Sequence, residues 1–241
     1  MNSTSPYGST KRIVVFSGAG VSAESGIRTF RDSGGLWEEY RIEEVATPEA
    51  WAKDPKRVLH FYDMRREQVI QALPNAAHLA IADLEQYFHV DVVTQNIDDL
   101  HERAGSTNVL HLHGEIRKAR STSDPELVTP IVGPRLAWGD KCALGSQLRP
   151  HIVWFGEEVP LLPVAAYIVA RADVLIVVGT SLQVYPAAGL VDHASSNSSI
   201  YVVDPEAMEN HLPNGVHIKA PASIGVPIVV DELLRSAGIS G

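Results

Sequence analysis

His111 and His113 are the residues of this chain best suited to proton transfer. They lie in the alternating segment 109–115 (VLHLHGE), which predicts a short strand with both imidazoles facing the same side. A histidine pair is also part of a metal site, but zinc requires more ligands than this pair offers. A general base is therefore the favoured functional interpretation for one of them. A structural histidine with satisfied hydrogen bonds is an equally good alternative.

Asn96 and Asp98 form a second candidate pair, directly after the apolar segment 90–94 (VDVVT). That segment predicts a buried strand, and polar residues at the carboxyl end of a parallel strand lie where open α/β sheets bind ligands. Their side chains could hold a carboxamide or a water molecule. The alternative is that Asp98 only caps the helix that follows.

Tyr62 and Arg65 form a third pair in the segment 60–66 (HFYDMRR). Residues three apart share a helix face, and a phenol beside a guanidinium makes a good binding site for a carboxylate. From these residues alone, an ordinary amphipathic helix with Arg65 in solvent is the favoured alternative.

The segment that would position a ligand for these groups begins with four apolar residues, 13–16, a predicted buried strand. Gly18 and Gly20 then predict a tight turn into a helix, whose N-terminus favours an anion such as a dinucleotide pyrophosphate. The third glycine of the usual fingerprint is replaced by Ala23, and no strand ending in an acid follows about 20 residues later. On the glycines alone, an ordinary strand–helix turn is an equal alternative.

Two later strands are expected to end at the same edge of the sheet. The segment 174–178 (VLIVV) is followed by Gly179, Thr180 and Ser181, a second turn suited to phosphate or ribose. Asp204 follows the predicted strand 199–203, where a carboxylate could bind a ribose hydroxyl. The sequence therefore predicts an α/β fold with a parallel sheet and one ligand crevice. It also predicts helical pieces over 37–73, broken at Pro48 and Pro55, and a C-terminal helix over 227–237.

Composition limits the alternatives. The 241 residues carry a net charge of -9, which argues against a nucleic-acid partner. No apolar run has the length of a membrane span, and no N-terminal signal peptide is recognisable, so we expect no membrane association. The single cysteine excludes an intramolecular disulfide and favours the cytoplasm.

Taken together, the motifs resemble the sirtuin family of NAD-dependent protein deacylases. The matching stretches occur in family order over nearly the whole chain: GAGVSAESGIRTFR at 18–31, TQNIDDLHERAG at 94–105, HGE at 113–115, HIVWFGE at 151–157 and GTSLQVYPAA at 179–188. The resemblance implies a Rossmann-type domain formed by 10–34, 75–115 and 147–241. It also implies a small module built from two insertions, 35–74 and 116–146.

The resemblance implies that NAD and an acylated lysine enter a cleft between these parts, in a monomer. His113 corresponds to the catalytic base, with Asn96 and Asp98 beside the nicotinamide and its ribose. Val153, Phe155 and Gly156 would line the lysine tunnel. The residues implied to contact the cofactor are Gly18, Ala19, Gly20, Glu24, Thr29, Phe30, Arg31, Trp37, Gln95, Asn96, Ile97, Asp98, Gly179, Thr180, Ser181, Asp204 and Ala222.

Tyr62 and Arg65 match the Tyr-x-x-Arg pair of the bacterial class III subgroup, which removes succinyl and malonyl groups. With this resemblance the functional interpretation of the pair becomes the favoured one. The expected activity is removal of succinyl, malonyl and also acetyl groups from lysine, giving nicotinamide and O-acyl-ADP-ribose. A plain deacetylase, a transferase of ADP-ribose to protein, and an NAD-binding sensor or scaffold with little catalysis are the alternatives.

The second insertion departs from the family. Most members bind a structural zinc ion there with cysteines, but this chain has Ser121, Ser123 and Asp124 at the first position and only Cys142 at the second. We therefore expect no metal site. Apolar packing is expected to stabilise the module instead, through Leu127, Val128, Pro130, Ile131, Leu136 and Trp138.

Overall fold

A six-stranded parallel sheet dominates the computed structural model, which describes residues 11–28, 40–206, 212 and 215–239. The strand order is β3-β2-β1-β7-β8-β9, and every neighbouring pair is parallel. This confirms the predicted Rossmann-type sheet. The strands are β1 (Arg12–Ser17), β2 (His89–Thr94), β3 (Val109–His111), β7 (Val174–Val178), β8 (Ser199–Val203) and β9 (Val216–Ile218).

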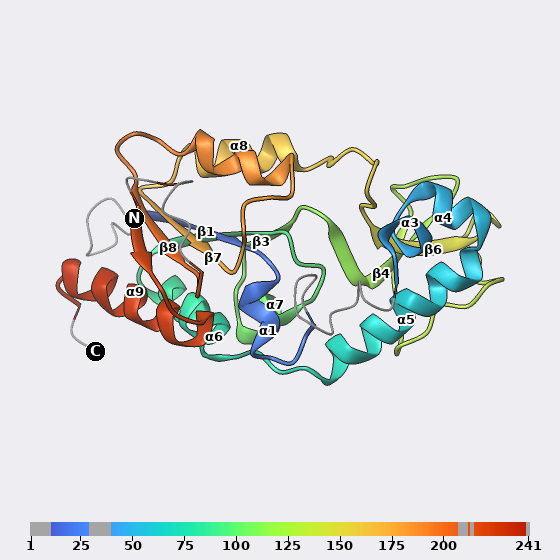
Figure 1. Ribbon diagram of the computed structural model, residues 1–241, viewed down its shortest axis with the longest axis horizontal. Coiled ribbons are helices and arrows are strands. Elements are labelled where there is room, and N and C mark those ends of the chain that lie inside the picture. The colour runs from blue at the N-terminus through green and yellow to red at the C-terminus, as the bar shows by residue number, and fades with distance from the viewer. Residues whose placement is uncertain (1–10, 29–39, 207–211, 213–214, 240–241) are drawn as a thin grey trace, which may run out of the picture.

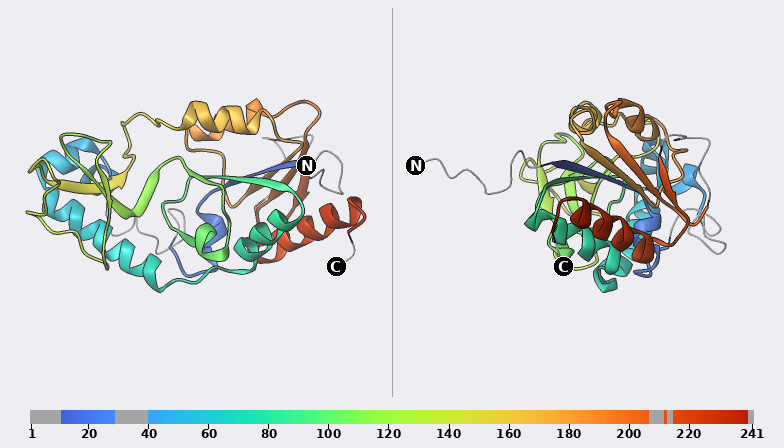
Figure 2. Two further views of the ribbon diagram at one scale, coloured as in Figure 1. Left: turned by 180° about the vertical axis from the view of Figure 1, so that it is seen from behind. Right: turned by 90° about the vertical axis from the view of Figure 1, so that its left-hand side faces the viewer.

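Helices cover both faces of this sheet, which explains the uninterrupted apolar strands. Ile13 and Val15 of β1 face one apolar cluster, beneath α6 (Ala76–Asp83) and α9 (Ala222–Ser236). Val14 and Phe16 face the other, beneath α8 (Leu162–Val169) and the 3₁₀ helix η2 (Ala187–His193). Figures 1 and 2 show α8 on one side of the strands and the pair α6 and α9 on the other.

A smaller antiparallel sheet lies beside the parallel one. Its strand order is β5-β4-β6, and α3, α4 and α5 lie against it at the right of Figure 1. The predicted breaks between helices at Pro48 and Pro55 are confirmed, because each proline begins a new helix that the preceding Thr47 or Asp54 caps. The elements are α3 (Ile42–Val45), α4 (Pro48–Lys53), α5 (Pro55–Gln71), β4 (Gly114–Ser121), β5 (Val128–Pro130) and β6 (Leu148–Ile152).

These elements come from the two predicted insertions and from the residues that flank them. The exact boundaries given above for the two parts remain a prediction. Three short elements complete the described chain: α1 (Gly20–Ala23), η1 (Leu84–Gln86) and α7 (Leu100–Ala104). No helix among the described residues is both long and apolar enough to cross a membrane.

The second insertion has hydroxyl groups at the positions where the resemblance led to an expectation of zinc-binding thiols. Ser121 accepts a hydrogen bond from the Cys142 thiol (3.3 Å), and Ser146 donates to Ser123 (2.7 Å). Ser121 and Ser123 are also hydrogen-bonded to each other (3.1 Å). A structural zinc site needs four thiolate, imidazole or carboxylate ligands, and this set of donors does not fit one.

The predicted apolar packing of this insertion is correct only in part. Ile131 and Leu136 are buried in a cluster with Leu59 of α5. Val128 and Trp138 are instead exposed, although the Trp138 ring lies 6.3 Å from that of Trp51. Hydrogen bonds among the hydroxyls therefore share the stabilisation with a small apolar core.

Two predicted elements differ from the structure. The strand expected over 109–115 ends at His111, and a turn containing His113 leads into β4 at Gly114, where φ is +81°. The C-terminal helix, expected over 227–237, already begins at Ala222 and contains Pro227. The proline hides this start because it is normally a sign of a helix boundary.

Candidate functional site

The two glycine turns are in direct backbone contact. The Gly18 amide donates to the Val178 carbonyl (3.0 Å), and the Gly20 amide donates to the Gly179 carbonyl (2.8 Å). A Cβ atom on Gly20 would lie 2.7 Å from the Gly179 Cα, and one on Gly179 would lie 2.2 Å from the Val21 nitrogen. These glycines are thus required for the close packing of two strand ends, independently of any ligand.

The turns meet where the strand order reverses. From β1 the chain continues outward to β2 and β3, whereas β7, β8 and β9 lie on the other side of β1. Such a switch point opens a crevice outside the carboxyl ends of the strands, and ligands bind there in open α/β sheets. Gln95, after β2, spans this crevice by donating to the Thr180 hydroxyl after β7 (3.0 Å).

Asn96 and Asp98 share one hydroxyl group, that of Ser22 in α1. The Ser22 Oγ donates to Asp98 Oδ2 (3.0 Å) and accepts from Asn96 Nδ2 (3.3 Å). The other carboxylate oxygen of Asp98 accepts from the amide of Leu100, the first residue of α7 (3.1 Å), although the N-cap position of that helix is Asp99 rather than Asp98. Burial raises the pKa of Asp98, while the hydrogen bonds from Leu100 and Ser22 oppose this shift.

His78 completes this network, although no motif in the sequence marks it as a site residue. Its Nδ1 accepts from the Asn75 amide (3.3 Å), which places its proton on Nε2, 3.4 Å from Ser22 Oγ. Burial lowers the pKa of His78 to about 4, so the ring is neutral. Ser22 and His78 were missed because a lone serine or histidine in an apolar segment carries no spacing signal.

A second buried histidine, His101, has its ring centre 4.9 Å from that of His78. Its Nε2 contacts Ser17 Oγ (3.0 Å), and Ser17 in turn donates to Thr94 Oγ1 (2.8 Å). All of these residues are buried. This buried polar network therefore supports the Asn96–Asp98 loop and makes it more rigid.

His113 has the geometry of a base. Its Nδ1 lies 3.0 Å from the Gln95 carbonyl oxygen, which can only accept, so Nδ1 carries the proton and Nε2 has the free lone pair. Burial lowers the pKa of His113, so the ring is neutral at pH 7. The imidazole is thus oriented by the same loop that carries Asn96 and Asp98.

His111 differs from His113 because both of its nitrogens face acceptors. Nδ1 lies 2.8 Å from the Asn96 carbonyl oxygen, and Nε2 lies 2.7 Å from Glu102 Oε1. Burial alone would lower the pKa of His111, but the hydrogen bond and charge of Glu102 outweigh it and the pKa is raised. A protonated ring is a poor base, so the geometry favours His113 over His111 for proton abstraction.

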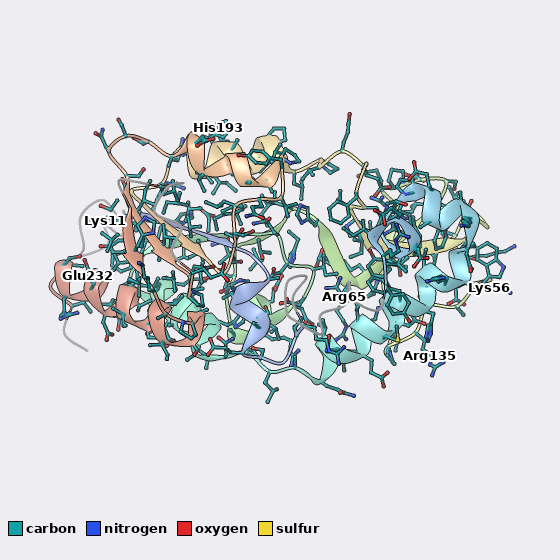
Figure 3. All side chains as sticks on the ribbon, viewed as in Figure 1. Lys11, Lys56, Arg65, Arg135, His193 and Glu232 are labelled. Carbon is teal, nitrogen blue, oxygen red and sulfur yellow. The ribbon has the colours of Figure 1, made fainter. Side chains whose placement is uncertain are left out.

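Tyr62 and Arg65 are both buried on the inner side of α5, contrary to the alternative in which Arg65 faces solvent. Arg65 lies toward the middle of the molecule in Figure 3, with its guanidinium 5.8 Å from the Phe61 ring centre. Burial raises the pKa of Tyr62 to about 12, although the charge of Arg65 and the indole of Trp154 oppose this shift. Burial lowers the pKa of Arg65, and the charges of Tyr62 and Asp98 counteract this shift.

The segment 153–156 follows β6 and connects to both parts of the molecule. The Val153 amide donates to the His113 carbonyl (3.0 Å), and the Phe155 amide donates to the Ala46 carbonyl (3.0 Å). Phe155 is 46% exposed, whereas Trp154 is buried. Gly156 has a φ of +91°, which suits glycine at this turn.

Glu157 stabilises this segment through Arg149. Two hydrogen bonds of 2.7 and 3.0 Å join the carboxylate to the guanidinium, and the Trp154 amide also donates to it (2.8 Å). The guanidinium carbon lies 3.3 Å from the centre of the Trp154 ring. Burial opposes the ionised carboxylate, but these hydrogen bonds dominate and lower the pKa of Glu157.

This shift predicts an acid-dependent loss of stability. Because the folded pKa of Glu157 is lower than its unfolded value, the pair contributes fully above the unfolded pKa, about 4.3. The contribution disappears as the pH falls through the folded pKa. We expect Glu157→Gln to reduce the free energy of unfolding by about 1.5–3 kcal/mol at pH 7. Urea titrations should show this difference in unfolding free energy shrinking below about pH 4. The exposed control Glu126→Gln should match the parent chain at every pH. A difference between Glu157→Gln and the parent chain that does not change with pH would contradict the assignment.

The remaining residues that are predicted to contact the cofactor lie in different parts of the fold and differ in their hydrogen-bond partners and burial. Glu24 binds the start of α9, accepting from the Ser223 amide (2.9 Å) and hydroxyl (2.6 Å). Asp204 accepts from the Glu206 amide (2.9 Å) at the end of β8. Ala222 is the first residue of α9 and is buried in the core. Ile97 is half-buried against the apolar cluster of the small module. Ala19 directly precedes α1, and Ser181 is half-buried beside Thr180. Four further predicted residues lie outside the described part of the chain: Thr29, Phe30, Arg31 and Trp37.

Comparison with known proteins agrees with this geometry. The model of the Sir2 family matches residues 18–186. A protein of Helicobacter pylori strain J99 named "NAD-dependent protein deacylase" is 54% identical over 206 residues, which cover 86% of this chain and 88% of that protein.

Two solved structures have the same fold. A structure described as "Crystal structure of a Sir2 homolog-NAD complex" is 42% identical with a TM-score of 0.85, covering 95% of this chain and 91% of its own. Another, described as "Sir2-p53 peptide-NAD+", is 29% identical with a TM-score of 0.74, covering 96% and 95%. The parallel sheet, the crevice at its switch point and these matches lead to one conclusion: the chain belongs to the Sir2 family.

Proposed function

We propose that this chain is an NAD-dependent protein-lysine deacylase that prefers acyl groups ending in a carboxylate. The observation that supports the activity most directly is the position of His113. Its Nδ1 is bound to the Gln95 carbonyl, so its basic Nε2 is held beside the loop of Asn96 and Asp98. That loop lies at the crevice where the two glycine turns meet.

The residues at the crevice fit NAD. Gly18, Gly20 and Gly179 let the two turns pack closely enough to form the floor of the crevice, and Thr180 and Ser181 add hydroxyl groups beside them. NAD, when bound, supplies an electrophilic ribose carbon whose leaving group is nicotinamide. Asn96 and Asp98 are the polar residues that we assign to the nicotinamide and its ribose, with Gln95 beside them.

The chain's own contribution to catalysis is to orient groups and to move one proton. His113 Nε2 accepts a proton from a ribose hydroxyl, and the Gln95 carbonyl stabilises the resulting imidazolium through Nδ1. The network of Ser22 and His78 holds Asp98 in place without any movement of the loop. Fixed dipoles of this kind lower the cost of reorganisation during the reaction.

The acylated lysine is assigned to the segment 153–156. Its Val153 amide is bound to the His113 carbonyl, so a lysine lying along this segment would approach the base. The half-exposed Phe155 offers an apolar surface for the aliphatic part of the lysine. The solved "Sir2-p53 peptide-NAD+" complex of a family member supports a peptide partner for this surface.

The acyl preference rests on the pair formed by Arg65 and Tyr62 in the small module. Both side chains are buried on α5, and each influences the pKa of the other. Burying a guanidinium is costly, and a carboxylate at the end of a succinyl or malonyl group would offset that cost by accepting from the guanidinium and the phenol. An acetyl group offers no such acceptor.

The test of the activity is mass spectrometry of the products from NAD and a succinyl-lysine peptide. Formation of free lysine, nicotinamide and O-succinyl-ADP-ribose is the expected result. NAD binding without nicotinamide release would instead indicate a sensor or scaffold. Transfer of label from NAD to protein would indicate an ADP-ribosyltransferase.

Arg65→Met tests the acyl preference separately. Methionine keeps the apolar length of the side chain but removes the charge, so kcat/KM for a succinyl-lysine peptide should fall by about 30-fold or more. The value for the acetyl-lysine peptide should change by less than a few-fold. Arg57→Met, an exposed arginine of the same helix, is the matched control. Desuccinylation that survives Arg65→Met in a folded protein would exclude the proposed pocket and leave a plain deacetylase.

A further inference from the structure

A cavity of about 420 Å³ lies next to His111, on residues that the proposed catalytic site does not use. Glu102 of α7, His111 of β3 and Glu115 of β4 line it, together with Lys118 and His151. One ligand atom from each of Glu102, His111 and Glu115 lies within 4.8 Å of the others. From this geometry we infer that the cavity is a binding site for a divalent transition-metal ion, with Zn²⁺ as the best match.

The chemistry of the three donors supports this choice. Zinc binds both imidazole and carboxylate ligands, and zinc sites with three protein ligands leave one coordination position open for water. The two carboxylates also balance the double charge of the ion. Calcium and magnesium prefer oxygen ligands only, so the imidazole disfavours them.

His111 is already oriented as a ligand. Its Nδ1 donates to the Asn96 carbonyl (2.8 Å), and its Nε2 points at Glu102 Oε1 (2.7 Å). Metal-binding histidines usually donate their other N–H to a carbonyl or a carboxylate, which fixes the ring. On binding, the ion takes the place of the Nε2 hydrogen, which is released to solvent, and the bond to Asn96 is kept.

His151 offers a further donor in the same cavity. It lies on β6 opposite Glu115 of β4, and its Nδ1 is buried without a hydrogen-bond partner among the described residues. Buried unpartnered nitrogen atoms are rare in folded proteins. This atom lies outside the cluster of three donors, so it is available to a metal-bound water molecule rather than to the ion itself.

Lys118 occupies part of the site at present. Its ammonium donates to Glu115 Oε2 (2.7 Å), and its side chain is 43% exposed. An incoming ion must displace this ammonium, and the partly exposed Lys118 side chain can rotate toward the solvent. Glu102 is also partly exposed, at 39%, so an ion can enter from outside. The bound ion would link α7, β3 and β4, three elements near the Asn96 loop.

The test is a titration of the full chain with Zn²⁺ alone, in a Cys142→Ser background that removes the one thiol. We expect one ion per chain, and a higher Tm with Zn²⁺ than with EDTA, because binding to the folded state stabilises it. Glu102→Gln and Glu115→Gln should each weaken zinc binding by about 10–100-fold. Lys118→Met should strengthen it, and the exposed control Glu126→Gln should leave it unchanged.

Each variant is first compared with the parent chain by circular dichroism, so that loss of binding is separated from loss of fold. Anomalous diffraction at the zinc edge, with a peak between Glu102, His111 and Glu115, is the direct confirming result. An absence of zinc binding by the folded parent chain would overturn the inference. So would zinc binding that both glutamine variants and Lys118→Met leave unchanged.

Discussion

Replacing His113 with alanine is expected to lower kcat/KM for deacylation by about 10²–10⁴-fold, the range that general acid–base catalysis supplies. The imidazole is held through Nδ1 by the Gln95 carbonyl, and no other described histidine combines that orientation with a free basic nitrogen beside the same loop. Binding of NAD should change by less than a few-fold, because His113 is assigned to proton transfer rather than to the pyrophosphate. Product formation by mass spectrometry and NAD affinity by calorimetry measure the two effects separately.

His60→Ala is the matched control, since His60 is an exposed histidine on α5. It should retain the activity of the parent chain. Near-normal turnover by His113→Ala would exclude His113 as the base. A parallel loss of NAD binding and of Tm would show that the ring is structural, which was the alternative recognised from the sequence.

Gly179→Ala is expected to destabilise the fold and to abolish tight NAD binding. A Cβ at this position would lie 2.2 Å from the Val21 nitrogen and 2.5 Å from the Gly20 carbonyl carbon. Both are backbone atoms, which cannot rotate away from the clash as a side chain could. The residue also has a φ of +60°. Overpacking and a left-handed residue together cost about 2–5 kcal/mol of the free energy of unfolding. Because the two glycine turns must separate to relieve the clash, the cofactor crevice changes shape with them.

Gly189→Ala in η2 is the control for this substitution. The nearest atom to its Cβ is Tyr185 Cε1, at 3.8 Å, and its φ lies outside the left-handed region. Its unfolding free energy in urea should therefore stay within about 0.5 kcal/mol of the parent value. If Gly179→Ala unfolds at the same urea concentration as Gly189→Ala, the contact between the two turns is not as close as the structure shows.

Motifs that depend on local chemistry were predictable from the sequence. The apolar run before Gly18 and the run before Gly179 became the neighbouring strands β1 and β7, because uninterrupted apolar strands are stable only in a sheet covered on both faces. Pro48 and Pro55 divided the helical segment as expected, and each begins a new helix because proline is preorganised for the first helical turn. The family resemblance extended these local predictions to the order of the whole chain.

Contacts between distant segments were not predictable in this way. The sequence placed His111 and His113 on the same strand, but the strand ends at His111, and the two rings differ because their partners differ. His113 has one carbonyl partner and stays neutral, while His111 is bound between a carbonyl and the Glu102 carboxylate. No residue spacing encodes that difference, since Glu102 of α7 and His111 of β3 are nine residues apart and meet only in the folded chain.

The sequence by itself determined which strands are buried and which side chains are candidates for binding NAD, since these follow from residue type and spacing. Only the tertiary structure decided how those side chains act. It buried Arg65, joined Ser22 and His78 to Asp98, and pressed Gly179 against Gly20. The physical reason is that burial and hydrogen-bond partners set protonation and orientation, and both arise from segments that meet only in the folded chain.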